Sequence, residues 1–464
     1  MVNLRDYQID LIDRCRQRFA EGNRRVIAQA MTGAGKTHIS SEMIRLAVAR
    51  NKRCLFVAHR RRLIEQKSDR LRMFGVHHGI VMAGEHRTPA MVQDASRDTL
   101  LSREELPPAD FVVVDECHNA SSSEYRALLN RYKHAHILGL TATPTRSDGK
   151  GLAPWWQAME CCVGVSRLIE EGALVPIKCF TQPKSKDKAS KLIGDPIQHW
   201  QTLAMGLPTV LFTSRRTLSV GYVQKFCSAG IPAEHIDSQT PDDRRDEVIN
   251  RLASGKIMVV CNVGIWTEGV DIPQLACCIL LRLAKSYVLY AQAVGRIMRP
   301  YPGKTHGVLI DHAGAVRKHG LPDMDVEWSL DADSTIDERV SKQRKKEAKP
   351  RTCPRCFLVH RPAPICPNCG YSYKTVSSQE SSNYKQGLLV AADGKVIPSG
   401  VNDKLRYWKT CLAVMANKGR SCAAASMMYK NRFGEFPREN DVGPLPRKGS
   451  WHTPVVQFYP QYAK

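Results

Sequence analysis

The sequence predicts an α/β protein with two parallel-sheet lobes, followed by a small cysteine-rich module and a helical C-terminal region. Three observations support this fold class. Short apolar runs that end in polar residues alternate with helix-like segments over roughly the first 320 residues, and this rhythm occurs twice. A polar, lysine-rich segment separates the two copies. Four cysteines in two close pairs then precede a stretch with helical apolar spacing. Because parallel sheets bind ligands at the carboxyl ends of their strands, functional residues are expected there.

The first lobe is predicted to span residues 1–175 and the second lobe residues 207–330. In the first lobe, the expected strands are the run RRVIA and residues 54–59, 110–116 and 136–143. In the second lobe, they are residues 209–214, 232–237, 256–262, 276–281 and 307–312. Residues 176–206, which include TQPKSKDKASKLIGDP, are predicted to form a linker because they are polar and rich in lysine.

After residue 330 the alternation of strands and helices stops. Residues 331–350 include the run RVSKQRKKE and are predicted to form a basic linker or a solvated helix, with an extra hold on a polyanion as the alternative. Residues 351–374 hold the cysteine pairs, and residues 375–464 are predicted to be helical. Within residues 405–436 the apolar spacing favours a helical hairpin divided by Gly419. The methionine and aromatic side chains of this hairpin are expected to pack together rather than to stack on bases.

Composition narrows the function classes. The chain has 464 residues, 43% of them hydrophobic, and a formal net charge of +23, which predicts attraction to a polyanion such as nucleic acid. A membrane-surface protein is the competing interpretation, but no long apolar span and no amphipathic helix with an aromatic face stands out. The N-terminus MVNLRDYQID has no apolar core of a signal peptide, and 16 scattered cysteines suit a reducing compartment. A cytoplasmic location is therefore expected.

The stretch AQAMTGAGKTHIS predicts a loop that binds phosphates. Gly33 and Gly35 allow backbone conformations that let amide N–H groups turn inward around an anion. The helix that starts near Lys36 points its positive end at the same place. The Lys36 ammonium would reach the β and γ phosphates, and the Thr37 hydroxyl would complete the coordination of Mg²⁺. Ala30 stands where the usual pattern has glycine. The alternative interpretation is a glycine-rich turn with a surface lysine.

In VVVDECHNA, Asp115 and Glu116 follow an apolar strand. Asp115 could hold Mg²⁺ and Glu116 could orient or deprotonate an attacking water, as phosphoryl transfer to water requires. Acidic pairs at strand ends also occur for solubility. The position of this pair some 80 residues after a phosphate loop favours the catalytic interpretation.

Six motifs in order resemble those of the superfamily 2 helicases and translocases. The motifs are LRDYQ, AMTGAGKT, DECH, TATPTR, TEGVDIP and QAVGRIMRP, and the resemblance covers about residues 1–320. It implies two RecA-like lobes with ATP bound in the cleft between them. It further implies that Arg5 and Gln8 read the adenine and that Thr32, Gly33, Ala34, Gly35, Lys36 and Thr37 hold the phosphates. Gly269 and Asp271 would lie near the ribose.

The same resemblance assigns catalytic and coupling roles. Gln292, Arg296 and Arg299 match the pattern Q-x-x-G-R-x-x-R, and both arginines would approach the γ-phosphate across the cleft. The residues expected to couple the nucleotide site to the nucleic acid are His118, Thr141, Ala142 and Thr143. A solvated helix face is the alternative for the arginines.

Contacts with the nucleic-acid strand are expected from hydroxyl, amide and arginine side chains at strand ends, because phosphate oxygens accept hydrogen bonds from these groups. The matching positions are His59, Arg60, Gln66, Ser96, Thr99, Ser214, Arg215 and Thr267. The run of three arginines at 60–62 could instead be a solvated helix start.

The segment CPRCFLVHRPAPICPNCG contains Cys353, Cys356, Cys366 and Cys369 as two C-x-x-C pairs. Two such turns can present four thiolates to one Zn²⁺, which predicts a small zinc ribbon. A redox pair is the alternative, but it requires one motif in a thioredoxin-like setting. His360 could replace one ligand, but because four cysteines are available it is not expected to bind the metal.

The order of two lobes, four-cysteine ribbon and a tail with an FGEFP turn resembles the RadD-like DNA-repair helicases of bacteria and bacteriophages. This resemblance favours DNA over RNA, in single-stranded, duplex or junction form, with room for a protein partner in repair or replication. ATP, Mg²⁺ and Zn²⁺ are the implied cofactors. Three functions remain open: an ATP-driven DNA helicase or translocase, the motor subunit of a restriction system, and an ATP-gated annealing or clamp factor.

Overall fold

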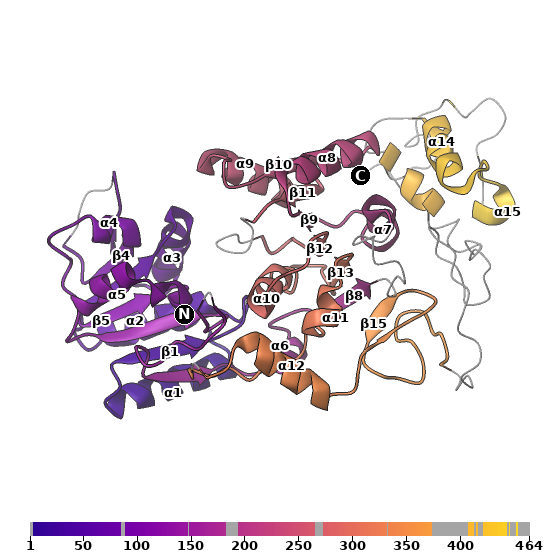
Figure 1. The fold of residues 1–464 in the computed structure, drawn as a ribbon. Coiled ribbons are helices and arrows are strands. Elements are labelled where there is room, and N and C mark those ends of the chain that lie inside the picture. Colours follow the sequence, from indigo (N-terminus) through magenta and orange to yellow (C-terminus); the bar gives the residue numbers. More distant parts are fainter. Residues whose placement is uncertain are drawn as a thin grey trace. The chain divides into compact units, whose positions relative to one another are not determined.

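The computed structural model describes residues 3–84, 89–146, 148–181, 194–264, 272–331 and 333–373. In the C-terminal region it describes residues 407–412, 414–415, 421–442, 445 and 452. The chain divides into two compact units, Met1–Lys374 and Thr375–Lys464, and each is described by itself. The predicted fold class is confirmed, because the first unit contains two sheets built mainly of parallel strands (Figure 1).

The sheet of the first lobe has the strand order β3-β4-β2-β5-β6-β1-β7, and every pairing in it is parallel. Its strands are β1 (Arg25–Gln29), β2 (Cys54–Ala58), β3 (Gly79–Val81), β4 (Val92–Ser96), β5 (Phe111–Val114), β6 (His136–Thr141) and β7 (Ala158–Cys161). β2 and β5 are buried along their whole length. Continuous apolar runs, instead of alternation, are expected of strands covered on both faces.

Helices cover this sheet. They are α1 (Asp6–Ala20), α2 (Lys36–Val48), α3 (Arg61–Met73), α4 (Arg97–Leu101), the 3₁₀ helix η1 (Cys117–Ser121), α5 (Ser123–Asn130) and α6 (Val165–Glu170). In α1, for example, Leu11, Ile12 and Cys15 are buried on one face, as helical spacing requires.

The register of the sheet brings three loops together. Gln29 of β1 pairs with Thr141 of β6, and Val114 of β5 pairs with Gly139 of β6. Because these strands are neighbours and run the same way, the loops that follow β1, β5 and β6 leave the same edge of the sheet. The glycine-rich loop, the acidic pair and the Thr141–Thr143 segment therefore meet there.

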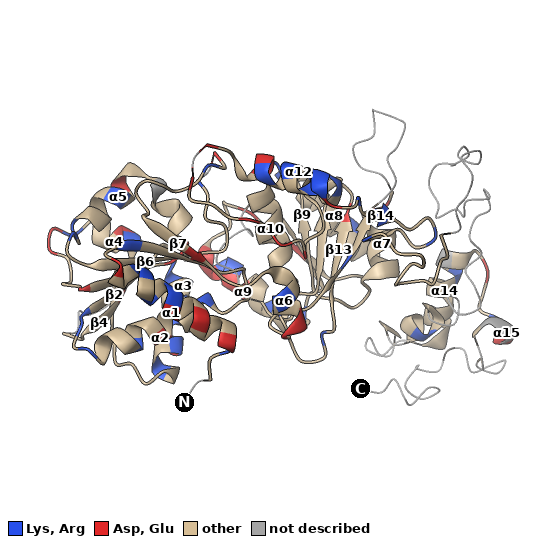
Figure 2. Cartoon of the chain, turned by 90° about the horizontal axis from the view of Figure 1, so that it is seen from below, with Lys and Arg blue, Asp and Glu red and all other residues tan. Residues whose placement is uncertain are grey.

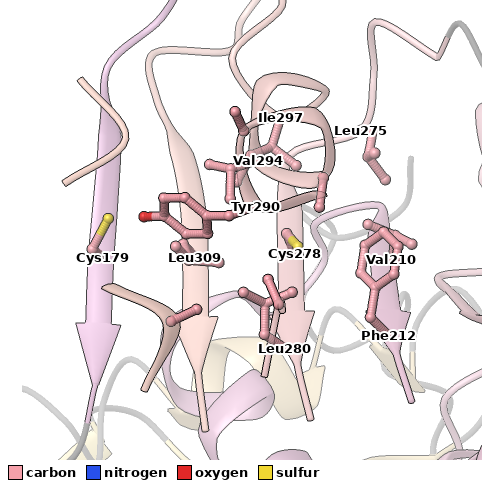
Figure 3. Close-up of a cluster of buried hydrophobic side chains, with 14 of the residues drawn as sticks. Cys179, Val210, Phe212, Leu275, Cys278, Leu280, Tyr290, Val294, Ile297 and Leu309 are labelled. Carbon is pink, nitrogen blue, oxygen red and sulfur yellow. The ribbon is translucent and has the colours of Figure 1, made fainter. Parts of the chain in front are cut away.

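The sheet of the second lobe has the order β10-β11-β9-β12-β13-β8-β15-β14. Its strands are β8 (Ile177–Thr181), β9 (Thr209–Phe212), β10 (Ala233–Ile236), β11 (Val259–Asn262), β12 (Cys277–Leu280), β13 (Gly307–Asp311), β14 (Arg351–Thr352) and β15 (Leu358–His360). The accompanying helices are α7 (Pro196–Leu203), α8 (Arg216–Ser228), α9 (Asp242–Ala253), α10 (Tyr287–Gly295), α11 (Ala315–His319) and α12 (Ile336–Lys346). Figure 3 shows Tyr290, Val294 and Ile297 packed against side chains of this sheet.

The sequence suggested that residues 176–206 form a linker, but parts of this segment belong to the second lobe. Residues 177–181 form β8, which pairs in parallel with β13, and Cys179 belongs to the core of the second lobe (Figure 3). Residues 196–203 form α7, whose Trp200 is buried and donates a hydrogen bond to the Thr209 hydroxyl at 2.6 Å. A five-residue strand beside a lysine-rich stretch gives a weak local signal, and its pairing partner lies about 130 residues away in the sequence. Residues 182–193 lie outside the described part of the chain.

The cysteine-rich module extends the same sheet. β14 and β15 form an antiparallel hairpin, and β15 pairs antiparallel with β8 through Leu358 and Val359. Cys353 and Cys366 are buried in the same core cluster as Phe180 of β8. The module is therefore an integral edge of the second lobe, although the sequence suggested a separate domain.

Residues 331–350 are predicted from the sequence to form a basic linker or a solvated helix, and most of them form a helix. They contain α12, which begins with a capping box between Thr335 and Glu338 and buries Ile336 and Val340 in the core of the second lobe. Its last turn is basic, and Figure 2 shows lysine and arginine residues along this helix. The helix agrees with one of the two sequence alternatives, but it is docked through two buried apolar residues, one turn apart, and is solvated only on its other faces.

The second unit contains α14 (Cys422–Phe433), α15 (Glu439–Val442) and helical residues 407–412. Trp408 and Tyr429 are buried together, with ring centroids 6.0 Å apart. These aromatic side chains pack in a core, as the sequence predicts. Gly419 lies outside the described residues. No helix in the described part of the chain is long and apolar enough to cross a membrane.

Candidate active site

The loop between β1 and α2 is held by glycines in the left-handed region. Gly33 has φ 95° and Gly35, the N-cap of α2, has φ 88°. A Cβ atom on Gly33 would lie 2.8 Å from Leu174 and 3.3 Å from Cγ of Arg299, and one on Gly35 would collide with the Gln8 amide. The backbone of this loop is thus closely packed, while Lys36 and Thr37 begin the helix that follows it.

Residues at the start of the chain support this loop. Tyr7 Oη and Gln8 Nε2 each donate a hydrogen bond to the carbonyl oxygen of Ala34 at 3.1 Å. The other amide atom of Gln8 accepts a hydrogen bond from the backbone N–H of Arg5, and the Arg5 guanidinium donates to the carbonyl of Glu171. Gln8 therefore contacts the loop directly. Tyr7 could not be identified from the sequence, because an aromatic residue in a helix gives no signal that separates loop support from core packing.

The acidic pair follows β5 in a constrained turn. Glu116 has φ 46°, which is unusual for a residue with a side chain, and its N–H donates to Asp115 Oδ1 at 3.0 Å. Burial, then the charge of Glu116, raises the pKa of Asp115 to about 6. Burial would also raise the pKa of Glu116, but the charges of Lys36, His118 and Arg296 lower it to about 2. Cations converge on Glu116, which keeps this carboxylate ionised.

A chain of polar contacts leads from Glu116 to the second lobe. His118 Nδ1 lies 3.3 Å from Glu116 Oε2 and 3.0 Å from Thr141 Oγ1. Thr141 Oγ1 accepts the N–H of Thr143 at 3.1 Å, and the Thr143 hydroxyl accepts from Gln292 Nε2 at 3.4 Å. The carbonyl of Ala142 accepts from Gln29 Nε2 at the end of β1. The four residues expected to couple the sites are thus in one connected network.

The end of α10 contacts the glycine-rich loop. A Cβ atom on Gly295 would lie 3.3 Å from Cβ of Thr32, and Arg299 packs next to Gly33. Arg296 is only 5% exposed and lies near enough to Glu116 to lower its pKa. Residues 296–299, the arginine segment of the second lobe, therefore face the glycine-rich loop of the first lobe.

The two residues between these arginines belong to different cores. Ile297 is buried in the core of the second lobe, whereas Met298 is buried in the core of the first. The Met298 carbonyl also accepts a hydrogen bond from the N–H of Val175 at 2.8 Å. The arginine segment is consequently anchored in both lobes.

Comparison with known proteins agrees with this arrangement. Residues 1–146 match the family model of the type III restriction enzyme res subunit, and residues 197–301 match the helicase conserved C-terminal domain. The chain belongs to superfamily 2 of the helicases. Enzymes of this class are nucleic-acid-dependent ATPases, and this helicase carries both of their domains.

Individual relatives extend over most of the helicase. A 51.5 kDa protein of a Lactococcus phage is 28% identical over 387 residues, covering 79% of this chain and 82% of that protein. The Saccharomyces cerevisiae protein IRC3, named as an ATP-dependent helicase, is 27% identical over 359 residues. That alignment covers 67% of this chain but 52% of IRC3, so the chain spans about half the length of this yeast relative.

A solved structure shows the same fold. The Type ISP restriction-modification enzyme LlaBIII, in a structure bound to DNA, superposes with a TM-score of 0.50 at 20% sequence identity. The match covers 67% of the helicase and 28% of LlaBIII.

Three of the eight residues expected to contact the nucleic-acid strand lie at the carboxyl ends of β2 and β4. His59 and Arg60 follow β2, and Ser96 ends β4, where Ala58 and Ser96 are paired. Gln66 lies on α3 and Thr99 on α4. In the second lobe, Ser214 and Arg215 are exposed between β9 and α8. Thr267, Gly269 and Asp271 lie outside the described residues.

Four cysteines form a candidate metal centre in the helicase. The sulfur atoms of Cys353, Cys356, Cys366 and Cys369 all lie within 4.8 Å of one another. The Cys353–Cys369 and Cys356–Cys366 pairs are 3.6 and 3.7 Å apart. Tetrahedral thiolates at about 2.3 Å from one ion would be roughly 3.8 Å apart, so the residues fit a zinc ion. Both ring nitrogens of His360 contact other groups, the Arg361 carbonyl and the Tyr373 hydroxyl, which supports its exclusion as a ligand.

Proposed function

We propose that this helicase hydrolyses ATP between its two lobes to move along or remodel DNA in repair, recombination or replication. The contact between the arginine segment that follows α10 and the glycine-rich loop is the observation that carries the proposal. In this contact Arg299 packs next to Gly33, and the charge of Arg296 lowers the pKa of Glu116, which supports an ATP site between the lobes. A change in the position of one lobe would therefore alter the charges around the reacting phosphate.

In this proposal each side chain has a distinct task. Lys36 binds the β and γ phosphates, and Thr37 and Asp115 are the residues that would hold Mg²⁺, which supplies charge neutralisation when bound. Glu116 orients or deprotonates the attacking water. Gln292, Arg296 and Arg299 stabilise the charge that develops on the γ-phosphate. Gln8 and Arg5 would contact the adenine, with Gly269 and Asp271 near the ribose.

The carboxyl ends of β2, β4 and β9 are proposed to bind the sugar-phosphate backbone. Hydroxyl, imidazole and guanidinium groups follow these strands, and such groups can bind phosphate oxygens of any sequence, which suits a motor that moves along the backbone. DNA is favoured because the model that matches the first lobe is named for a restriction enzyme subunit. The resemblance to RadD-like enzymes points the same way.

The four-cysteine centre is proposed to bind one Zn²⁺ that stabilises the edge of the second lobe. The buried cysteines share a core with β8, so metal binding would contribute to folding free energy.

The test is ATP hydrolysis measured without polymer and with single-stranded DNA, duplex DNA, forked DNA or RNA at one moderate salt concentration. The salt must be matched because binding to a protein of charge +23 depends steeply on it. Stimulation by DNA and not by RNA is expected. Stimulation by RNA alone would contradict the DNA assignment.

A second candidate is the motor subunit of a restriction system, which the match of residues 1–146 favours. This function predicts a partner protein that recognises or cuts DNA. Copurification of a nuclease or methyltransferase subunit that raises ATP hydrolysis would favour it over an independent motor.

A further inference from the structure

Lys304 lies in a tight turn immediately after the arginine segment. The sequence YPGK forms this turn, with the Lys304 N–H donating to the Tyr301 carbonyl at 2.9 Å and Gly303 at φ 79°. Proline followed by a residue with positive φ is the pattern of a type II turn. The turn brings the chain back on itself, so the lysine side chain can reach toward residues it has just passed.

The ammonium group of Lys304 contacts three carbonyl oxygens. Its Nζ atom donates to Arg299 at 2.8 Å, to Leu275 at 2.6 Å and to Pro273 at 3.3 Å. An ammonium has three N–H donors and no acceptor, so these contacts satisfy it fully. Desolvation, then the charge of Arg299, lowers the pKa of Lys304 to about 7. Backbone carbonyl oxygens therefore hold this amine in a poorly hydrated place.

The three carbonyls belong to two segments that matter for the proposed reaction. Arg299 is one of the two arginines proposed to stabilise the γ-phosphate. Pro273 and Leu275 come shortly after the TEGVD sequence, which is residues 267–271. A single side chain therefore ties the end of the arginine segment to the chain that leaves the TEGVD sequence.

The peptide at Arg299 is held from both sides. Its preceding carbonyl, that of Met298, bonds to Val175 N–H at 2.8 Å, and its own carbonyl bonds to Lys304. Fixing these two carbonyls fixes the direction of the Cα–Cβ bond of Arg299, whose Cγ packs next to Gly33. An error of about 1 Å in the placement of a catalytic group can cost on the order of a hundredfold in rate.

We propose that Lys304 is a positioning residue that holds the backbone of Arg299 in the orientation needed for hydrolysis. This inference rests on the proposed catalytic role of Arg299. Lys304 itself does not touch the phosphates; it acts through the main chain of the arginine.

The experiment is a double-mutant cycle between the two residues. The variants are Lys304→Met, Arg299→Ala and the pair together, with kcat and KM for ATP measured in the full chain and melting temperature recorded for each. Lys304→Met is expected to lower kcat by roughly tenfold to a hundredfold with KM nearly unchanged. In the Arg299→Ala background the same change should have no further effect on kcat beyond about twofold, because the residues act as one unit.

Two further variants sharpen the result. Lys304→Arg keeps the charge and several hydrogen-bond donors and should therefore recover most of kcat. If Lys304 only filled space, this recovery would not be expected. Lys256→Met removes an exposed lysine of the same lobe and should leave kcat and KM as in the wild type.

The outcomes separate the two proposals. If Arg299→Ala kept the wild-type kcat, the catalytic assignment of Arg299 would be wrong. If Arg299→Ala were slow and the loss from Lys304→Met added to it in full, only the inference about Lys304 would be overturned. Melting of Lys304→Met below the assay temperature would also overturn it, because the lysine would then serve the whole fold.

Discussion

The Nδ1 atom of His118 lies 3.0 Å from the hydroxyl oxygen of Thr141. The same nitrogen is 3.3 Å from Glu116, so one imidazole joins the acidic pair to the segment that follows β6. Thr143 and Gln292 continue this network into the second lobe. The network offers a direct physical route by which the nucleotide site and the lobe arrangement can influence each other.

His118→Ala should uncouple ATP hydrolysis from nucleic acid. Loss of the imidazole removes the bridge between Glu116 and Thr141 but leaves the loop and both carboxylates in place. Stimulation by the preferred polymer is expected to fall by roughly tenfold, while hydrolysis without polymer changes little. The ratio of stimulated to basal rates is the measurement, and His134→Ala, on an exposed histidine, is the control. An unchanged ratio would show that coupling takes another route.

Lys36→Ala should abolish ATP hydrolysis while leaving the fold intact. The lysine ammonium has one described hydrogen bond, to the Ala30 carbonyl at 3.4 Å, so its removal disturbs no core. The lost charge is the one proposed to bind the β and γ phosphates. Turnover and the melting temperature of the variant should be measured together. Normal turnover would overturn the nucleotide assignment.

Purified protein should contain about one zinc per chain. Cys353→Ser should remove this metal and lower the melting temperature by on the order of 5 °C, because the cysteine lies in the core that the ribbon shares with β8. Metal analysis and a thermal melt check this prediction. Cys227→Ser, which changes an exposed cysteine of the same lobe, should keep both values. If the purified protein contained no zinc, the assignment of a zinc ribbon would be wrong.

Gly151→Ala should destabilise the protein. The backbone of Gly151 and Ala153 bonds to the carbonyls of Asp331 and Leu330, and a Cβ at position 151 would collide with both oxygens. A cost of about 1–3 kcal/mol in the free energy of unfolding is expected. Chemical denaturation measures it.

The matched control is Gly221→Ala in the interior of α8, where a Cβ meets nothing within 4 Å. That variant should be stabilised by about 0.5–1 kcal/mol, since alanine favours a helix. Equal effects of the two substitutions would show that the contact at Gly151 carries no stability.

Much of the fold could be predicted because its signals are local. The FVVV run of β5 is buried on both faces. Four consecutive apolar residues therefore predict this strand without knowledge of its partners. β8 could not be found in this way. Its partners β13 and β15 lie about 130 and 180 residues further along the chain, and only pairing with them makes a strand of a segment beside a lysine-rich stretch.

The same division applies to the site. Gly33, Gly35 and Lys36 can be identified from the sequence because a phosphate loop needs small residues and a cation at fixed spacing. Lys304 and Tyr7 carry no such pattern. A lysine after Pro-Gly is indistinguishable from a solvated turn residue until its three carbonyl partners are seen.

By itself, the sequence determined the two parallel-sheet lobes, the glycine-rich loop, the acidic pair and the cysteine quartet. Each of these depends on residue types at short, fixed separations, which fix backbone conformation and ligand chemistry locally. Only the tertiary structure decided that the ribbon completes the sheet of the second lobe, that α12 is docked, and that Met298 and Lys304 hold the arginine segment. These features depend on contacts between distant segments or on side-chain direction, and sheet register and packing set both.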